Sequence, residues 1–156
     1  MKLILTAPTV RASLMASGAS AFDPADLQKL KDTNECMACD LSEAFLSEAD
    51  LTGADLRKAN LMGIFLTETN LRGAFLSEAD LRGAFLREAE LRETDLKGAD
   101  LNKASMVGAD LNNADMSDAD LSGADLTNAD LSKATMKGVI FCNTTMPDGS
   151  VIYSGC

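Results

Sequence analysis

Four cysteines are the side chains of this sequence best suited to redox or metal chemistry. Cys36 and Cys39 are separated by two residues, whereas Cys142 and Cys156 lie near the C-terminus. The first spacing is typical of zinc sites and of redox-active thiol pairs. The chain contains no histidine, the commonest general base and metal ligand. These residue types favour structural or redox cysteines and lower the expectation of catalysis.

Carboxylates are a second reactive group, and they are abundant. The 156 residues include 24 Asp and Glu against 14 Lys and Arg, a net charge of −10. This charge disfavours contact with nucleic-acid phosphates or an anionic membrane surface. No apolar run approaches the ~20 residues of a membrane-spanning helix, so we expect no membrane insertion. Without a Ser-His-Asp set, a phosphate-binding loop or a convergent metal cluster, we predict a protein that is not an enzyme and needs no cofactor or metal.

The N-terminal residues 1–21 differ in composition from the rest of the chain. They carry two basic side chains and precede the first acidic residue, Asp23, and small residues occupy positions 19–21. Such a segment is typical of a cleaved export or organelle-targeting sequence. Pro8 and Arg11 interrupt its apolar core, which leaves a disordered N-terminus in a cytoplasmic protein as the alternative.

A period of five residues governs most of the chain. A large apolar residue recurs at every fifth position from Leu41 to Met146 without an insertion, and a compact residue, usually Ala, precedes each by two positions. On a helix, at about 100° per residue, this stripe would drift around the circumference. A coil that turns a corner every five residues keeps both residues inward. We therefore predict a solenoid whose repeats bury their apolar pairs by stacking, with glycines such as Gly53 and Gly73 at tight corners.

The stretches "ADLTGADLRKANL" and "ADLNNADMSDADLSGADLTNADL" match the A-[DN]-L-x-x signature of the pentapeptide-repeat family. The chain resembles this family over residues 37–146. The resemblance implies an all-β fold, a right-handed quadrilateral β-helix with four five-residue repeats in each turn. At a sheet spacing of ~4.8 Å, its five to six turns would form a rod of roughly 25 Å.

Both ends of the rod carry sequences unlike the repeat. Asp23 followed by Pro24 predicts a short capping helix over residues 24–32, within an N-terminal cap of residues 22–36. Residues 147–156 form a C-terminal tail with a turn at Pro147-Asp148-Gly149. The stretches "TNECMACDLSEA" and "FCNTTMPDGSVIYSGC" resemble the first and last segments of cyanobacterial and chloroplast members. Covered ends prevent polymerisation through open strand edges, so we expect a monomer.

The length of the predicted rod bears on whether the cysteines bind zinc or form disulfides. It holds the two N-terminal cysteines far from the two C-terminal ones, which argues against a zinc site of four cysteines. We predict a disulfide between Cys142 and Cys156 that closes the tail. For Cys36 and Cys39 a structural pair and a redox-active pair both stay open; the inward repeat position of Cys39 favours the structural role. Disulfides persist in oxidising compartments, in agreement with a targeting segment.

With four repeats in each turn, residues twenty apart stack on one face. The slot before each central Leu then forms two acidic columns, Asp40, Asn60, Asp80, Asp100 and Asp120 on one face and Asp50, Asn70, Glu90, Asp110 and Asp130 on another. A calcium site needs six to eight oxygens that converge, and a straight wall does not supply them. We therefore prefer a solvated surface with side-chain bonds to turn backbone over a calcium site or a mimic of DNA phosphates.

Phenylalanine replaces Asp or Asn in the same slot on one face, while Phe75 falls on the opposite face. The resulting candidate interaction face has six members: Phe45, Phe65, Phe85, Glu48, Glu68 and Glu88. Exposed aromatic rings in a row mark contact surfaces. Stacked rings also reinforce a sheet without any partner. Both interpretations stay open at the level of sequence.

Two functions are compatible with these features. The first is a non-catalytic structural or protein-interaction scaffold of the thylakoid lumen or a periplasm, with an unidentified protein partner and no nucleic acid. The alternative is a DNA-mimicking protein that binds gyrase or another topoisomerase, as some family members do. Those members favour Phe at the central position and dimerise through an extended C-terminal segment, whereas this chain has Leu and a short tail.

Overall fold

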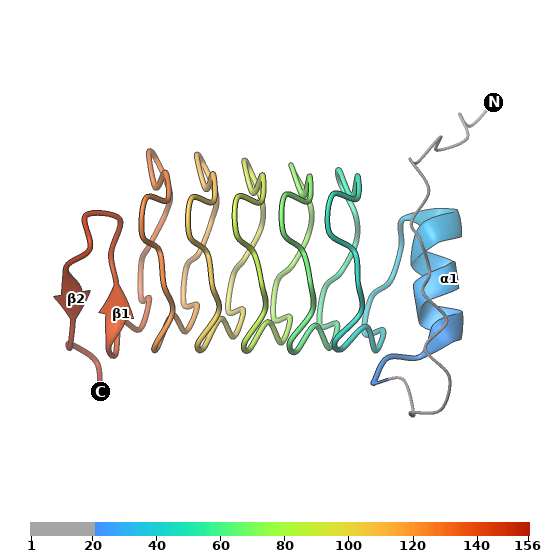
Figure 1. The fold of residues 1–156 in the computed structure, drawn as a ribbon, viewed down its shortest axis with the longest axis horizontal. Helices are drawn as coiled ribbons and strands as arrows, with labels where there is room; N and C mark the ends of the chain where they lie inside the picture. Colours follow the sequence, from blue (N-terminus) through green and yellow to red (C-terminus); the bar gives the residue numbers. More distant parts are fainter. Residues whose placement is uncertain (1–20) are drawn as a thin grey trace.

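The computed structural model describes residues 21–156 and shows a stack of coils with one helix at its N-terminal end (Figure 1). Three regular elements are present in this range: helix α1 at Pro24–Thr33, strand β1 at Thr144–Thr145 and strand β2 at Val151–Ile152. Between α1 and β1 the chain consists of five-residue segments, each ending in a turn. The predicted targeting segment lies outside the described residues, except for its last position.

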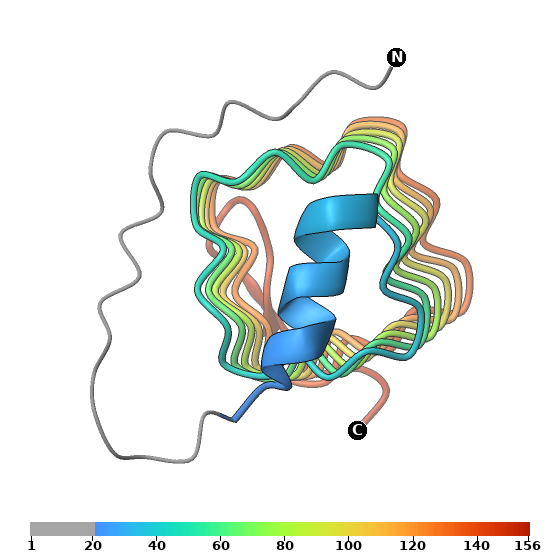
Figure 2. The same ribbon diagram turned by 90° about the vertical axis from the view of Figure 1, so that its right-hand side faces the viewer.

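Parallel bridges join residues that are twenty apart in sequence. The series begins with Glu35 and Asp55 and continues to Asp125 and Thr145. Each coil of the β-helix therefore takes twenty residues, and successive coils superimpose when they are viewed down the axis (Figure 2). This register places equivalent five-residue segments directly above one another, as the sequence period requires.

The core is a column of large and small apolar side chains inside the coils. The central residues from Leu41 to Leu126 are buried, and so are nearly all the alanines two positions before them. Met106 and Met116 fill central positions without exposure. Thr69 and Thr94 replace alanines, and their buried hydroxyls donate to the carbonyls of Leu46 (2.8 Å) and Leu91 (2.5 Å). These bonds satisfy the polar groups that burial would otherwise penalise.

A tight turn closes every five-residue segment. The N–H of Ala44 donates to the carbonyl of Leu41 at 3.1 Å, and Glu43 between them has φ of 57°. A positive φ at the third turn residue is the mark of a type II turn, which favours glycine. Gly53 occupies this position with φ of 64°, as expected for a tight corner. Several charged residues, Glu43 among them, adopt the same left-handed conformation, which the sequence analysis did not anticipate.

Helix α1 is one residue longer than the predicted 24–32 range. Asp23 accepts the N–H of Ala25 at 2.8 Å and begins the helix. Asn34 ends it in the left-handed conformation, with its N–H donated to the carbonyl of Leu30 at 2.8 Å. This C-terminal cap extends the helix to Thr33. Leu30 is buried in the core, and α1 lies across the end of the first coil (Figure 2).

The C-terminal end is covered by a small hairpin. Strand β1 pairs with β2 in antiparallel register, with Thr144 opposite Ile152 and Thr145 opposite Val151. The predicted turn lies between them, where the N–H of Gly149 donates to the carbonyl of Met146 at 2.9 Å. The inward residues of the last coil stay partly exposed: Leu131, Met136, Phe141 and Met146. The core is therefore less completely covered at this end than beneath α1.

Candidate functional site

The phenylalanine wall is the column of outward positions 45, 65, 85, 105 and 125. Parallel bridges join Phe45 to Phe65 and Phe65 to Phe85, after which Ser105 and Asp125 continue the column. The first two rings stack with centroids 4.4 Å apart, and the second pair is 4.8 Å apart, with interplanar angles of 6° and 8°. The predicted register of three stacked rings is therefore present.

These rings remain accessible to solvent. Phe45 is 67% exposed and Phe85 is 44% exposed, while Phe65 between them is half-buried. Met62, in the turn between the Asx wall and the segment of Phe65, is 43% exposed. Because the rings stack along the axis, their edges face outward. The wall therefore offers an apolar strip along three coils.

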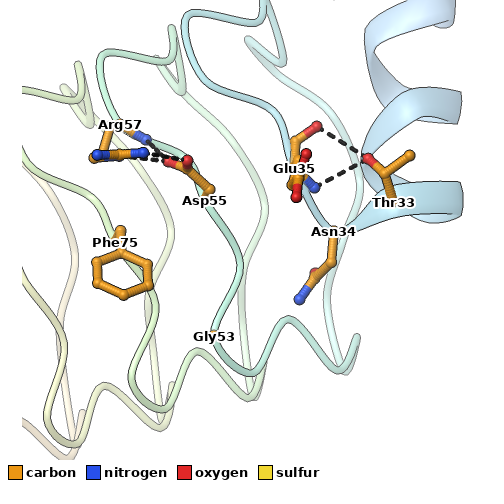
Figure 3. Close-up of a pocket in the computed structure, with 7 residues that line it drawn as sticks. All are labelled: Thr33, Asn34, Glu35, Gly53, Asp55, Arg57 and Phe75. Atoms are coloured by element: carbon orange, nitrogen blue, oxygen red, sulfur yellow. Dashed lines mark hydrogen bonds and ion pairs between the residues drawn. The ribbon is translucent and has the colours of Figure 1, made fainter. Parts of the chain in front are cut away.

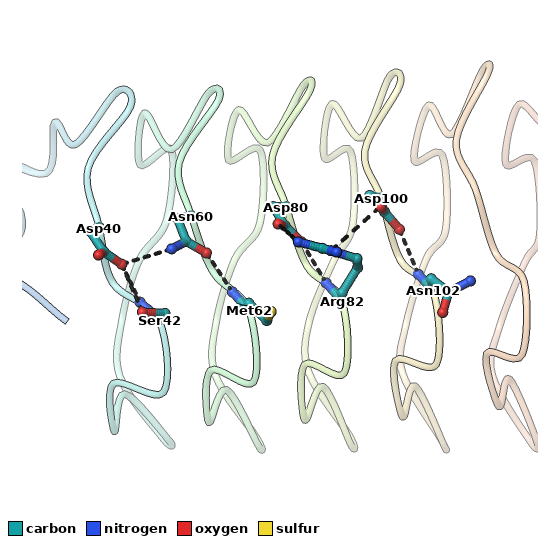
Figure 4. A network of polar contacts seen from close by, with 8 residues as sticks. All are labelled: Asp40, Ser42, Asn60, Met62, Asp80, Arg82, Asp100 and Asn102. Carbon is teal, nitrogen blue, oxygen red and sulfur yellow. Dashed lines mark hydrogen bonds and ion pairs between the residues drawn. The ribbon is translucent and has the colours of Figure 1, made fainter. Parts of the chain in front are cut away.

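The Asx wall is the neighbouring column of outward positions 40, 60, 80, 100 and 120. Each side chain there accepts the backbone N–H two residues later, as Asp40 does from Ser42 at 3.1 Å and Asn60 from Met62 at 3.3 Å (Figure 4). Asp80, Asp100 and Asp120 repeat this bond. The expected bonds to turn backbone are thus present, and they give the acidic column a structural role.

Phenylalanine has no acceptor for the equivalent N–H. Among residues 21–156, no protein acceptor reaches the amides of Ser47, Thr67 and Arg87, which follow the three rings of the phenylalanine wall. Sequence reasoning missed this row of free donors. The sequence does show Phe in a position that usually holds Asp or Asn. This exchange indicates a free amide only when the Asp or Asn is known to accept the N–H of the turn that follows it.

The three glutamates of the candidate face form the glutamate column along one corner of the phenylalanine wall. Glu48, Glu68 and Glu88 all adopt positive φ, at 61°, 56° and 56°, and all are exposed. Glu88 accepts from Arg87 at 3.4 Å. Within the described part of the chain, Glu48 and Glu68 form no ion pair. Two of the three carboxylates are therefore unneutralised beside the rings.

Basic side chains of the middle coils pair with acidic neighbours. Arg82 contacts Asp80 at 2.6 Å and reaches toward Asp100 at 3.7 Å on the Asx wall (Figure 4). The hydrogen bond from this guanidinium lowers the pKa of Asp80. Further pairs are Lys58–Glu78, Arg72–Glu93, Arg87–Glu88, Arg92–Asp110 and Lys97–Asp115. Exposed pairs of this kind contribute little to stability individually.

A shallow pocket of about 400 Å³ lies between the end of α1 and the wall that carries Phe75 (Figure 3). Two of its charged groups satisfy each other, because Arg57 donates to both carboxylate oxygens of Asp55, at 2.8 and 2.6 Å. This pairing lowers the pKa of Asp55. Phe75 is 47% exposed and is bridged to Asp55 and Asp95 rather than to another ring. The pocket thus presents a lone ring beside a satisfied ion pair.

The cysteines lie in two pairs at disulfide distance. The sulfur atoms of Cys36 and Cys39 are 2.06 Å apart, and those of Cys142 and Cys156 are 2.09 Å apart. Cys36 and Cys39 are buried next to α1, where the Cys36 sulfur lies 3.2 Å from the carbonyl oxygen of Asp26. In residues 21–156 no three His, Cys, Asp or Glu side chains are grouped to hold a metal ion. No helix in this range is long and apolar enough to cross a membrane.

The repeat identifies the family of the chain. The model of the pentapeptide repeats matches in 8 copies, over residues 38–67, 60–98 and 104–143. The chain therefore belongs to the pentapeptide-repeat family, whose members adopt a right-handed β-helix. No curated protein sequence matches it.

Solved structures of pentapeptide repeat proteins resemble this one. A protein from Nostoc PCC 7120 is 31% identical, with a TM-score of 0.58, over 72% of this chain and 93% of that one. A protein of the Arabidopsis thaliana thylakoid lumen is 30% identical, with a TM-score of 0.45, over 66% and 68% of the two chains. Rfr23 from the cyanobacterium Cyanothece 51142 is 30% identical, with a TM-score of 0.45, over 74% and 92%.

Proposed function

We propose that this protein is a non-catalytic scaffold that binds another protein through the phenylalanine wall. The observation that carries this proposal is the ladder of three stacked rings, of which Phe45 is 67% exposed. Contiguous exposed apolar side chains on a soluble surface mark interaction sites. A ladder that served only to reinforce the coil would gain from burial of its rings, whereas this one leaves their edges open to solvent.

The proposed location is an exported or lumenal compartment, the thylakoid lumen or a periplasm. Two cysteine pairs at disulfide distance support it, because disulfides persist where the environment is oxidising. The composition of residues 1–21, with basic and small residues before the first acidic one, supports it independently. On this proposal residues 1–21 are removed during translocation.

The remaining parts of the chain have structural roles in this proposal. Residues 37–146 form the rod, for which we propose a quadrilateral cross-section; the register of twenty residues, four segments in each coil, supports it. Residues 22–36, with α1, cap the first coil, and residues 147–156 close the last one through Cys142 and Cys156. Covered strand edges keep the molecule monomeric.

Mass spectrometry of the protein purified from its native host tests the compartment. We expect the mass of a chain that begins at residue 22, with thiols that resist alkylation until they are reduced. A full-length chain with four free thiols would contradict the proposed location. It would then favour the cytoplasmic alternative, a gyrase-binding protein, which is tested by a supercoiling assay.

Site-specific photo-crosslinking in the native host tests the interaction. A photoreactive amino acid at position 65, on the phenylalanine wall, should capture a partner protein. The matched control places the same group at position 75, an exposed phenylalanine of the opposite face. Equal capture from both positions, or from neither, would contradict a binding role for the phenylalanine wall.

A further inference from the structure

We infer that the phenylalanine wall is built to bind a basic amphipathic segment of its protein partner. In this complex, apolar side chains of the segment pack against the three rings, and its Lys or Arg side chains pair with the glutamate column. The inference rests on the proposed function, because it specifies the chemistry of the partner that the scaffold binds.

The apolar half of the surface comes from the three rings. Phe45, Phe65 and Phe85 expose their edges along three coils. Burial of apolar surface is favourable in protein association. A single aliphatic or aromatic side chain would cover only part of this strip. The length of the ladder therefore favours a segment with several apolar residues in a row along one side.

The charged half of the surface selects the sign of the partner. Glu48 and Glu68 form no ion pair in the described part of the chain, and exposed Glu43, at the other corner beside Phe45, forms none either. Carboxylates of the Asx wall are instead engaged by turn amides, and Asp80 also by Arg82. Free carboxylates on both sides of an apolar strip attract cations and repel anions.

The same charge argues against two other occupants. A second copy of this chain would bring its own glutamate column to the interface, where like charges oppose association. Lipid surfaces with anionic headgroups would be repelled in the same way. A basic amphipathic segment is the occupant that satisfies both the rings and the carboxylates.

The backbone offers a third feature to an extended segment. The amides of Ser47, Thr67 and Arg87 have no protein acceptor in the described residues and follow the three rings. Carbonyl oxygens of a bound segment can accept these N–H groups, in the role that Asp and Asn side chains have on the Asx wall. The strip thus combines apolar, acidic and donor groups along one line.

Binding of a short, fluorescently labelled peptide of alternating leucine and lysine to the full chain tests the inference. In an extended peptide, leucines lie on one side and lysines on the other. We expect saturable binding at about 0.15 M salt, where attraction between distant charges is largely screened. A peptide of alternating leucine and glutamate should not bind.

Substitution of the rings by asparagine separates recognition from folding. Asparagine occupies the same slot at positions 60 and 70 and accepts the turn amide there, so Phe45→Asn, Phe65→Asn and Phe85→Asn together should keep the fold. This triple variant should bind the leucine-lysine peptide at least about tenfold more weakly, the loss that follows from about 1.4 kcal/mol. The matched control, Phe75→Asn on the opposite face, should bind it unchanged.

Neutralisation of the glutamates tests the charged half separately. The double variant Glu48→Gln and Glu68→Gln should weaken peptide binding severalfold and make the remaining binding less sensitive to salt, because fewer charge pairs are left to screen. Glu78→Gln is the control on the opposite face, because Glu78 occupies the same turn position beside Phe75, with φ of 57°. This control also releases Lys58, which pairs with Glu78 at 3.4 Å. Equal effects of Glu78→Gln and Glu68→Gln would mean that net charge alone attracts the peptide.

Three outcomes of the experiments on the purified chain would overturn the inference. They are no binding of the leucine-lysine peptide, unchanged binding by the triple asparagine variant, and a dimer of the wild-type chain that the triple variant abolishes. Capture of a partner from position 65 through a surface without Lys or Arg would also overturn it, but would leave the proposed scaffold function intact. Failure of capture from position 65 contradicts that function instead.

Discussion

The phenylalanine wall and the Asx wall have the same backbone and opposite surfaces. In both, residues twenty apart are joined by parallel bridges, and alanine and leucine point inward on either side of the outward slot. On the Asx wall the slot holds a side chain that binds the following turn, whereas on the phenylalanine wall it holds a ring that binds its neighbours. The same outward position can therefore either stabilise the fold or present a side chain to another molecule.

The two uses of this slot have similar stabilising effects. A side-chain acceptor for a turn amide contributes about 0.5–1.5 kcal/mol, and a stacked aromatic pair contributes about as much beyond its burial. Folding alone therefore does not require rings on one wall and carboxylates on the other. What differs strongly is the chemistry that each wall presents to another molecule.

The largest expected effects test whether the two walls share one core. Leu66→Ala lies behind the phenylalanine wall and Leu81→Ala behind the Asx wall, and both leucines are fully buried. Each substitution should lower the free energy of unfolding by about 2–5 kcal/mol, because it leaves a cavity in a rigid coil. Chemical denaturation should give values for the two variants within about 1 kcal/mol of each other. A much milder effect of Leu66→Ala would mean that the ring ladder supports the coil from outside.

A smaller effect should separate the walls at their outward positions. Asp120→Ala removes the acceptor for the N–H of Ser122, a bond of 2.8 Å, and should cost about 1 kcal/mol of unfolding free energy. Asp120→Asn keeps an acceptor oxygen and should be nearly neutral. Ser105→Ala on the phenylalanine wall should change little, since no hydrogen bond of the Ser105 side chain is present in the described residues. Thermal denaturation that ranks Ser105→Ala beside Asp120→Ala would refute the structural role of the Asx side chains.

The turn positions should respond alike on opposite faces. Glu68 beside the phenylalanine wall and Glu78 beside Phe75 have φ of 56° and 57°, a conformation that glycine adopts without strain. Glu68→Gly and Glu78→Gly should each raise the free energy of unfolding by up to about 1 kcal/mol. Asparagine, which tolerates this region better than glutamate, should give an intermediate value in the same denaturation experiment. Destabilisation by glycine would show that these glutamate side chains hold the coil together.

The smallest effect concerns acid on the Asx wall. The bond from Arg82 lowers the pKa of Asp80 in the folded protein below its value in the unfolded chain. The stabilisation by ionised Asp80 is therefore fully present above the unfolded-state pKa and is lost as the pH falls through the folded-state pKa. Below about pH 4 the wild type should therefore lose less than about 1 kcal/mol of unfolding free energy, because the pair is exposed. The Asp80→Asn variant lacks this contribution and should not show the loss. Urea denaturation between pH 7 and pH 3 measures this difference. An identical pH dependence of the two proteins would contradict the role of the ion pair.

The uninterrupted period explains why the ring ladder could be predicted. No insertion occurs between Leu41 and Met146, so four segments in each coil fix which residues stack. The same arithmetic correctly separated Phe75 from the other three rings. Long-range register is usually hard to infer from sequence, but here it follows from counting, because each contact repeats a local motif.

Features that depend on turn geometry were not predicted. The free amides that follow the rings become apparent only when Asp and Asn are seen to accept the N–H two residues later. Left-handed glutamates contradict local propensity, since the bridges on either side of the turn impose the conformation. Helix α1 extends one residue beyond its predicted end because Asn34 supplies a left-handed cap. The pairing of β1 with β2 could not be predicted without knowing where the last coil ends.

The half-buried last coil implies a gradient of amide hydrogen exchange along the axis. Each coil contacts only its neighbours, so local opening can begin at an end and proceed coil by coil. Leu131, Met136 and Phe141 give the C-terminal coil weaker packing than the coils beneath α1. Amides of residues 126–146 should therefore exchange first, those near the middle last. The ring ladder lies on the first half of the rod, away from the end where fraying starts, and so keeps its shape while the tail opens and closes.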